Sequence, residues 1–212
     1  MKTLFIEAKK RHFENTELDF SCIPQKVGLL YTIQFEQIAK KIKTELEKQG
    51  KKVILGGQIT GCNFSSALKI EKNIDCFLLI SSGKFHPLSL ALNVNKPIYI
   101  IINNKLEKID SQHIKKKRKA AISKFLLADK IGIIISTKPR QFKLKKAILL
   151  KNKLKEKKVF LFISDTIDKK ELENFQIDAW LNTACPGLIF DISNMINLSE
   201  YKNLNKSIEK LK

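Results

Sequence analysis

Two of the four cysteines in this 212-residue sequence lie where a protein could hold a ligand. Cys62 lies in the run GGQITGCN and Cys185 in the run NTACPG, and each run directly follows an apolar stretch of strand length. Loops at the carboxyl ends of parallel strands are the usual ligand-binding positions of α/β proteins. The spacing alone indicates a metal only weakly, because zinc and ferredoxin signatures contain close cysteine pairs and no C-x-x-C pair occurs here. Cys76, within IDCFLLI, has the pattern of a buried core cysteine.

A histidine follows another apolar run. His86 lies in SSGKFHPL, between Gly83 and Pro87, where we expect a sharp exit from a strand into a loop. The imidazole either makes a structural hydrogen bond within that loop or faces a ligand beside the strand end. The sequence contains no P-loop, G-x-G-x-x-G, H-E-x-x-H or G-x-S-x-G motif, so nucleotide hydrolases, Rossmann dehydrogenases, zincins and α/β-hydrolases lack motif support.

The elements that must position these residues alternate between strand and helix patterns. This alternation predicts an α/β fold of parallel sheets with helices on both faces. In the first half we expect strands at 26–32, 51–57, 74–83 and 96–103, and helices at 35–50, 67–69 and 113–128. The pattern then restarts, with a strand at 130–137, a helix at 141–157 and strands at 157–164 and 177–187.

The restart has nearly the same register as the first half. Gly28 and Asp75 are 47 positions apart, and Gly132 and Asp178 are 46 positions apart. An internal duplication explains this agreement. We therefore expect two similar units, 25–128 with Cys62 and 129–212 with Cys185, whose ligand loops meet at a shared cleft. Residues 1–24 precede them, and the run MKTLFIEAKK reads either as an edge strand or as the last strand of an absent domain.

The net charge of +19 has two explanations. One is a compositional bias that leaves solvated lysine faces, and the other is a basic surface that meets an anionic partner. The 40 basic residues include only three arginines, Arg11, Arg118 and Arg140, whereas nucleic-acid recognition favours the guanidinium group, so nucleic acid is not an expected partner. The run KKKRK at 115–119 is interpreted as a solvated helix face, with an electrostatic contact as the alternative.

Targeting signals and membrane spans are not apparent in the sequence. The start MKTLFIEAKKRHFEN has no apolar leader segment, and the longest apolar runs are too short to cross a bilayer. We therefore expect a cytoplasmic protein with reduced thiols and no membrane contact.

Several blocks in order along the chain resemble the diphthamide synthase family. They are KVGLLYTIQ, GGQITGCNFSSA, SSGKFHPLSLAL, IIISTKPRQ and WLNTACPGLIFD, and the resemblance runs from about residue 26 to about residue 205. It implies an iron–sulfur enzyme that cleaves S-adenosylmethionine between sulfur and the γ-carbon. The 3-amino-3-carboxypropyl radical is then transferred to a histidine of translation elongation factor 2, the first step of diphthamide biosynthesis.

The resemblance also implies a ligand set. Family members have three homologous domains, each of which gives one cysteine to a [4Fe-4S] cluster. Cys62 matches the cysteine of the second domain, and Cys185 matches that of the third. The cysteine of the first domain has no counterpart here, because Cys22 does not occupy its position in the family pattern. Residues 1–24 then read as the final strand and linker of the missing domain. We expect a separate chain to carry that domain with the third cysteine, and the complete enzyme to be a dimer.

Roles for other residues follow from the same resemblance. Gly57 and Gly61 would let the backbone approach the cluster, and Pro186 would fix the chain after the cysteine. The family's basic residue after the N-T-A-C-P block is replaced by Gly187 here, and Arg140 stands where glycine is more usual. The expected S-adenosylmethionine contacts come from residues after predicted strands: Ser82, Gly83, Phe85 and His86, with Gln34, Gln58, Lys138 and Gln141 as weaker candidates.

Two alternatives from other functional classes remain open at this point. The chain could be a non-catalytic scaffold subunit of the same complex. It could also be a basic nucleic-acid-binding module, which only the net charge suggests.

Overall fold

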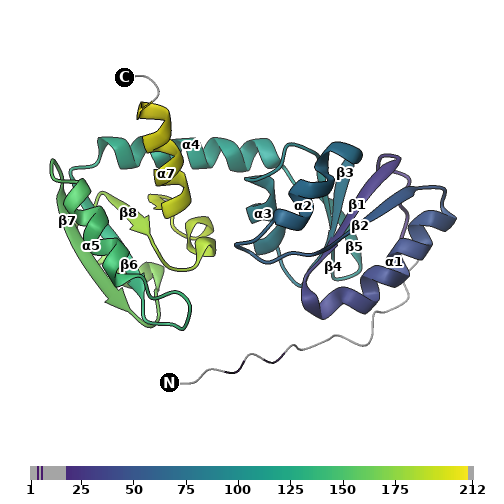
Figure 1. Cartoon of the computed structure of the whole chain (residues 1–212), viewed down its shortest axis with the longest axis horizontal. Coiled ribbons are helices and arrows are strands. Elements are labelled where there is room, and N and C mark those ends of the chain that lie inside the picture. Colours follow the sequence, from purple (N-terminus) through teal and green to yellow (C-terminus); the bar gives the residue numbers. More distant parts are fainter. Residues whose placement is uncertain (1–3, 5, 7–17, 210–212) are drawn as a thin grey trace. The chain divides into compact units, whose positions relative to one another are not determined.

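The computed structural model describes residues 4, 6 and 18–209 of the chain (Figure 1). The fold is α/β and divides into two compact units, Met1–Lys115 and Lys116–Lys212. The division falls within helix α4, Ser111–Leu127. The predicted boundaries at residues 24 and 128 stay predictions, as does a cleft shared by the two units. The strand predicted for residues 1–10 falls largely outside the described residues.

Unit 1 is built on a five-stranded sheet in the order β2-β1-β3-β4-β5. The first four strands are parallel, and β5 is an antiparallel edge. The strands are β1 Lys26–Tyr31, β2 Lys52–Gln58, β3 Cys76–Ile80, β4 Ile98–Ile102 and β5 Lys105–Lys108. The helical segments are η1 Ile33–Phe35, α1 Glu36–Lys48, α2 Ser65–Ile70, η2 Glu71–Asn73 and α3 Phe85–Ala91.

Helices cover both faces of this sheet, as the sequence predicts (Figure 1). Successive residues of a strand point to opposite faces, and β3 is buried at all five positions, which is typical of a central parallel strand. One face packs its alternate residues against α1, around Leu29 and Leu78. The other face packs Leu30 and Leu79 against α2 and α3.

The antiparallel strand β5 was not predicted. Asn103 and Asn104 connect it to β4 with φ values of +48° and +57°. Positive φ at both central residues is the geometry of a type I′ hairpin turn, and asparagine tolerates it better than most residues. The sequence KLEK of β5 has too little apolar pattern to reveal a strand.

Unit 2 contains a four-stranded, fully parallel sheet in the order β7-β6-β8-β9. Its strands are β6 Lys130–Ser136, β7 Lys158–Ser164, β8 Ala179–Asn182 and β9 Met195–Asn197. The helical segments besides α4 are α5 Leu144–Lys153, α6 Lys169–Glu173, η3 Pro186–Phe190 and α7 Leu198–Glu209. A core around Ile133 and Leu181 joins this sheet to α4, α5 and α7.

The predicted duplication is visible in equivalent contacts of the two units. Asp75 accepts a hydrogen bond from the first backbone N–H of β1 at 3.0 Å, and Asp178 accepts one from the first N–H of β6 at 2.8 Å. Gly28 and Gly132 both occupy the third position of these strands. A Cβ on Gly132 would lie 2.3 Å from the Trp180 ring, and one on Gly28 would lie 2.6 Å from an isoleucine methyl. Both glycines therefore admit a large neighbouring side chain.

Two local expectations are wrong. His86 lies in the first turn of α3 rather than in a loop, because proline is tolerated in the first turn of a helix, where Pro87 lies. The run 115–119 is not uniformly solvated, since Arg118 is 6% exposed. Among the described residues, no helix is both long and apolar enough to span a bilayer.

Candidate metal centre

Cys62 lies in the loop between β2 and α2, at the carboxyl end of the unit 1 sheet. A bulge precedes it, because the register of β1 against β2 shifts so that Leu30 pairs with Gly57. Gly57 has a φ of +89°, which glycine adopts at little cost. Apart from its chain neighbours, no atom of the described residues lies within 4 Å of where its Cβ would be, so its conformation rather than crowding explains the glycine.

A tight turn presents the Cys62 thiol. The backbones of Thr60 and Asn63 exchange two hydrogen bonds of 3.2 and 3.3 Å, which leaves Gly61 and Cys62 at the tip. The Asn63 side chain accepts hydrogen bonds from both the backbone N–H and the hydroxyl of Ser65, at the start of α2. Cys62 is exposed, and its sulfur lies 3.6 Å from the Thr60 hydroxyl, within hydrogen-bonding distance for sulfur.

The segment after β3 packs onto this turn. A Cβ on Gly61 would lie 2.2 Å from two ring atoms of Phe85, so the aromatic ring occupies the space that a side chain would need. The Phe85 and His86 rings lie 5.0 Å apart. Burial lowers the pKa of His86 from its ordinary value of 6.5, because a desolvated imidazolium is disfavoured. The neutral imidazole can therefore donate one hydrogen bond and accept another.

The other predicted contacts lie at the carboxyl edge of their own sheet. In unit 1, Gln34 is half-buried in η1 after β1, Gln58 is the exposed last residue of β2, and Ser82 is exposed after β3. Gly83 accepts a 2.8 Å hydrogen bond from the buried Ser81 hydroxyl through its carbonyl. The turn after β6 in unit 2 contains the remaining two, Lys138 and Gln141.

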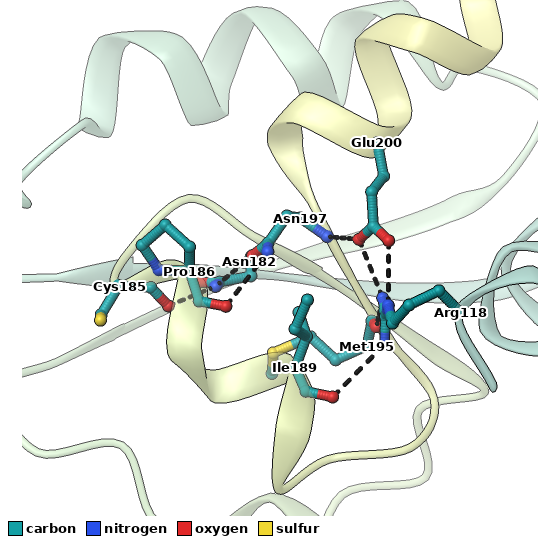
Figure 2. A network of polar contacts seen from close by, with 8 residues as sticks. All are labelled: Arg118, Asn182, Cys185, Pro186, Ile189, Met195, Asn197 and Glu200. Atoms are coloured by element: carbon teal, nitrogen blue, oxygen red, sulfur yellow. Dashed lines mark hydrogen bonds and ion pairs between the residues drawn. The ribbon is translucent and has the colours of Figure 1, made fainter. Parts of the chain in front are cut away.

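Cys185 is half-buried and follows β8 in unit 2. Pro186 begins η3 directly after it, so the fixed φ of proline defines the exit of the chain. The Asn182 side chain spans the turn: its oxygen accepts from the Ala184 N–H at 2.8 Å, and its nitrogen donates to the Cys185 carbonyl at 2.7 Å. Figure 2 shows the turn and the polar side chains behind it.

The remaining cysteines differ in their surroundings. Cys76 is 0% exposed, and burial raises its thiol pKa to about 12, so it is a core residue as predicted. Cys22 is exposed and precedes β1, away from the carboxyl end of that strand. Only Cys62 and Cys185 combine an accessible thiol with a strand-end loop.

Sequence reasoning missed two features near the sheet edges. The Thr32 hydroxyl at the end of β1 is buried and has no hydrogen-bond partner within the described residues. Arg118 forms a buried ion pair with Glu200. The sequence did contain a signal for the burial of Arg118, because helical spacing puts Arg118 on the same face of α4 as the apolar residues Ala121 and Phe125.

The donor set fits part of an iron–sulfur site. Thiolates are the ligands that iron–sulfur clusters use, and each unit offers one at the carboxyl end of a strand. Within the part of the chain that the structure describes, no three His, Cys, Asp or Glu side chains come together as a metal site.

Comparisons with known proteins connect this arrangement to a family. The family model described as "Putative diphthamide synthesis protein" matches residues 2–202. The 2-(3-amino-3-carboxypropyl)histidine synthase of Pyrococcus horikoshii is 32% identical over 180 residues, which cover 79% of this chain and 52% of that protein. Its namesake in Methanocaldococcus jannaschii is 27% identical over 176 residues, covering 79% of this chain and 46% of that protein.

Solved structures agree with the sequence matches. The crystal structure of Dph2 from Pyrococcus horikoshii with a 4Fe-4S cluster superimposes with a TM-score of 0.69 at 30% identity. The match covers 83% of this chain and 56% of that one. This chain thus spans about half the length of the relatives it matches. The resemblance noted from the sequence is confirmed, and the chain belongs to the family of diphthamide synthesis proteins.

Proposed function

We propose that this chain contributes two of the three thiolate ligands of a [4Fe-4S] cluster, in a 3-amino-3-carboxypropyl transferase of diphthamide biosynthesis. The observation that carries the proposal is the placement of Cys62 and Cys185, each an accessible thiol in a loop at the carboxyl end of a parallel strand. The Dph2 relative with a 4Fe-4S cluster supports iron–sulfur chemistry in this family. In the proposed reaction, the 3-amino-3-carboxypropyl group leaves S-adenosylmethionine as a radical and is attached to a histidine of translation elongation factor 2.

The residues of this chain would hold and shield the reactants. When bound, the cluster supplies the electron and the open iron position that cleavage of S-adenosylmethionine requires. Phe85 packs on Gly61 of the Cys62 turn, and the His86 ring lies 5.0 Å from the Phe85 ring. We propose that this aromatic ring and the neutral imidazole contact the co-substrate and exclude water. Ser82, Gly83 and Gln58 line the same edge of the unit 1 sheet. Gln34, Lys138 and Gln141 are proposed as further contacts by their places after β1 and β6.

The proposal assigns the third ligand to the first domain of the family. Two thiolates would leave two irons of a cubane without protein ligands, exposed to water and oxygen. Among the described residues, no three His, Cys, Asp or Glu side chains form a group that could hold a metal. The complete enzyme is proposed to be a dimer.

Anaerobic reconstitution tests the ligand assignment. The chain is coexpressed with a partner that carries the first domain, and iron, sulfide and modification of the elongation factor are measured. We expect about four irons per centre in the unaltered complex, and loss of iron and activity in Cys62→Ser and Cys185→Ser. Cys22→Ser is the matched control, because that thiol is also exposed but does not lie in a strand-end loop. Retained iron and activity in either ligand variant would refute the assignment.

A scaffold subunit is the second candidate function. In this role the duplicated fold would bind the elongation factor or another enzyme without holding metal. Full activity of the complex with Cys62 and Cys185 both replaced by serine would favour the scaffold.

A further inference from the structure

A continuous series of hydrogen bonds connects the Arg118–Glu200 ion pair to the turn that carries Cys185. All of its members belong to unit 2 and are drawn in Figure 2. They come from β8, from the junction of β9 and α7, and from α4, so three separate parts of the sequence converge on one turn.

Two asparagines form the part of this series nearest to the cysteine. Asn182 and Asn197 are register partners on the adjacent strands β8 and β9, and they are 2% and 8% exposed. The Asn182 amide donates to the Asn197 side-chain oxygen at 2.8 Å and to the Cys185 carbonyl at 2.7 Å. The Asn197 amide donates to the Pro186 carbonyl at 3.1 Å. The backbone carbonyls of Cys185 and Pro186 are therefore both held by asparagine side chains.

The ion pair secures the far end of the series. Glu200 accepts from the Asn197 backbone N–H at 2.8 Å, the glutamate half of a capping box at the start of α7. Arg118 binds both oxygens of Glu200 through Nε at 2.9 Å and Nη2 at 2.8 Å. It also donates to the carbonyls of Ile189 and Met195, which lie on either side of the segment that joins η3 to β9. These side chains thereby hold the segment between Cys185 and α7 at Cys185, Pro186, Ile189, Met195 and Asn197.

The fold itself does not require these polar side chains. In unit 1, the equivalent register pair of the duplicated sheet is Leu79 with Ile100, both 0% exposed. The same position can therefore be filled with apolar side chains, which avoid the desolvation cost of buried amides. Unit 1 has no cysteine after the strand concerned, β3, whereas unit 2 has Cys185 after β8.

We infer that Asn182 and Asn197, anchored by the Glu200–Arg118 pair, are positioning residues that hold the Cys185 turn in a ligand-ready geometry. This inference rests on the proposed function of Cys185 as an iron ligand. The amide donors reach backbone carbonyls and not the thiol, so the network fixes where the sulfur lies. Groups that orient a metal ligand typically change metal affinity 10- to 100-fold when they are removed.

The test measures thiol reactivity in the metal-free full chain. Alkylation rates of Cys22, Cys62 and Cys185 are determined by peptide-resolved mass spectrometry in Asn197→Ala. The matched control is Asn194→Ala, because that half-buried amide also donates to a carbonyl, of Asp178, but at the opposite end of β8. Denaturation midpoints are recorded for both variants.

We expect Cys185 to react at least fivefold faster in Asn197→Ala, because the turn loses a donor and opens, while Cys22 and Cys62 stay within twofold of the unaltered chain. All three thiols are expected to stay within twofold in Asn194→Ala. A smaller increase at Cys185, or an equal increase at all three cysteines, would overturn the positioning role. If Asn197→Ala does not fold, Glu200→Gln is used instead, because it weakens the hydrogen-bond network at its other end. In that variant, the expected result is an increase of at least twofold in the alkylation rate of Cys185 alone.

A spectroscopic measurement separates this inference from the proposed function. In the iron-loaded complex, Asn197→Ala is expected to alter the electron paramagnetic resonance spectrum of the reduced cluster, and Asn194→Ala is expected to leave it unchanged. If Cys185→Ser keeps its full iron content, the ligand assignment fails, whereas the alkylation result on metal-free protein still decides whether the network positions the turn.

Discussion

The contact between Gly61 and Phe85 yields a quantitative prediction about the Cys62 turn. A Cβ at position 61 would lie 2.2 Å from two atoms of the Phe85 ring. Carbon atoms in favourable contact are about 3.5–4.0 Å apart, so Gly61→Ala must displace the ring by about 1.5 Å. Overpacking of this kind typically costs about 1–3 kcal/mol of unfolding free energy. Gly83→Ala is the control, because no described atom beyond its chain neighbours lies within 4 Å of its Cβ position, and we expect a change below about 0.5 kcal/mol there.

A double-mutant cycle isolates the clash. Phe85→Ala is expected to cost about 1–3 kcal/mol, less than for a fully buried phenylalanine because the ring is only half-buried. In that background the added methyl group meets no ring, so Gly61→Ala should become neutral. The coupling energy should then equal the overpacking cost, about 1–3 kcal/mol.

The two units allow separate probes of unfolding. Cys76 is fully buried in unit 1, so its alkylation in urea reports the opening of that unit. Trp180 is the only tryptophan and lies in unit 2. The urea midpoint followed by its fluorescence is therefore an internal control and should be the same in every variant. Additive effects of Gly61→Ala and Phe85→Ala on Cys76 protection would refute the contact as the reason for glycine at position 61.

Three further substitutions test other parts of unit 1 with the same Cys76 probe. The pKa of His86 in the folded chain lies below 6.5, so between that pKa and 6.5 the unfolded chain binds more protons than the folded chain. The stability of unit 1 should therefore fall as the pH is lowered through that window. His86→Gln should remove this pH dependence, and an unchanged pH profile would contradict the explanation. Asn104→Gly should stabilise the β4–β5 hairpin by about 0.5 kcal/mol, since glycine adopts positive φ more easily, and a loss of stability would count against the type I′ turn. Thr32→Val should stabilise unit 1 by about 1 kcal/mol, because it removes a buried hydroxyl without a hydrogen-bond partner in the described structure, and destabilisation would show that the hydroxyl is satisfied.

Much of the fold was predictable because its signal is periodic and local. Apolar runs predicted all four parallel strands of unit 1, and the near-equal Gly–Asp spacings predicted the duplication that the contacts of Asp75 and Asp178 display. The one strand of unit 1 that was missed, β5, is short and charged, and its pairing depends on a turn formed by two asparagines. Its edge position means that burial imposes little pattern on its sequence.

For the candidate site, the sequence indicates two candidate ligand thiols, which stay a prediction, and does not indicate what surrounds them. Motif blocks located Cys62 and Cys185, but nothing in a sequence states that a ring will lie on Gly61 or that an arginine in a lysine-rich run will be buried. Both depend on which residues from distant segments meet. The buried face of α4 was nonetheless encoded, since Arg118 lies three and seven positions before two buried apolar residues.

The duplicated scaffold explains why the repeat could predict the architecture and not the site. The loop that corresponds to the Cys62 turn in unit 2 is 165–168, between β7 and α6, and it contains no cysteine. The segment that corresponds to the Cys185 turn in unit 1 is 81–84, after β3, and it contains none either. The two thiols thus follow different strands of the repeat, although both lie at carboxyl ends. Contacts that both units need for folding are repeated, whereas each of the two cysteines proposed as ligands appears in one unit only, because a proposed site is added to a fold and is not dictated by it.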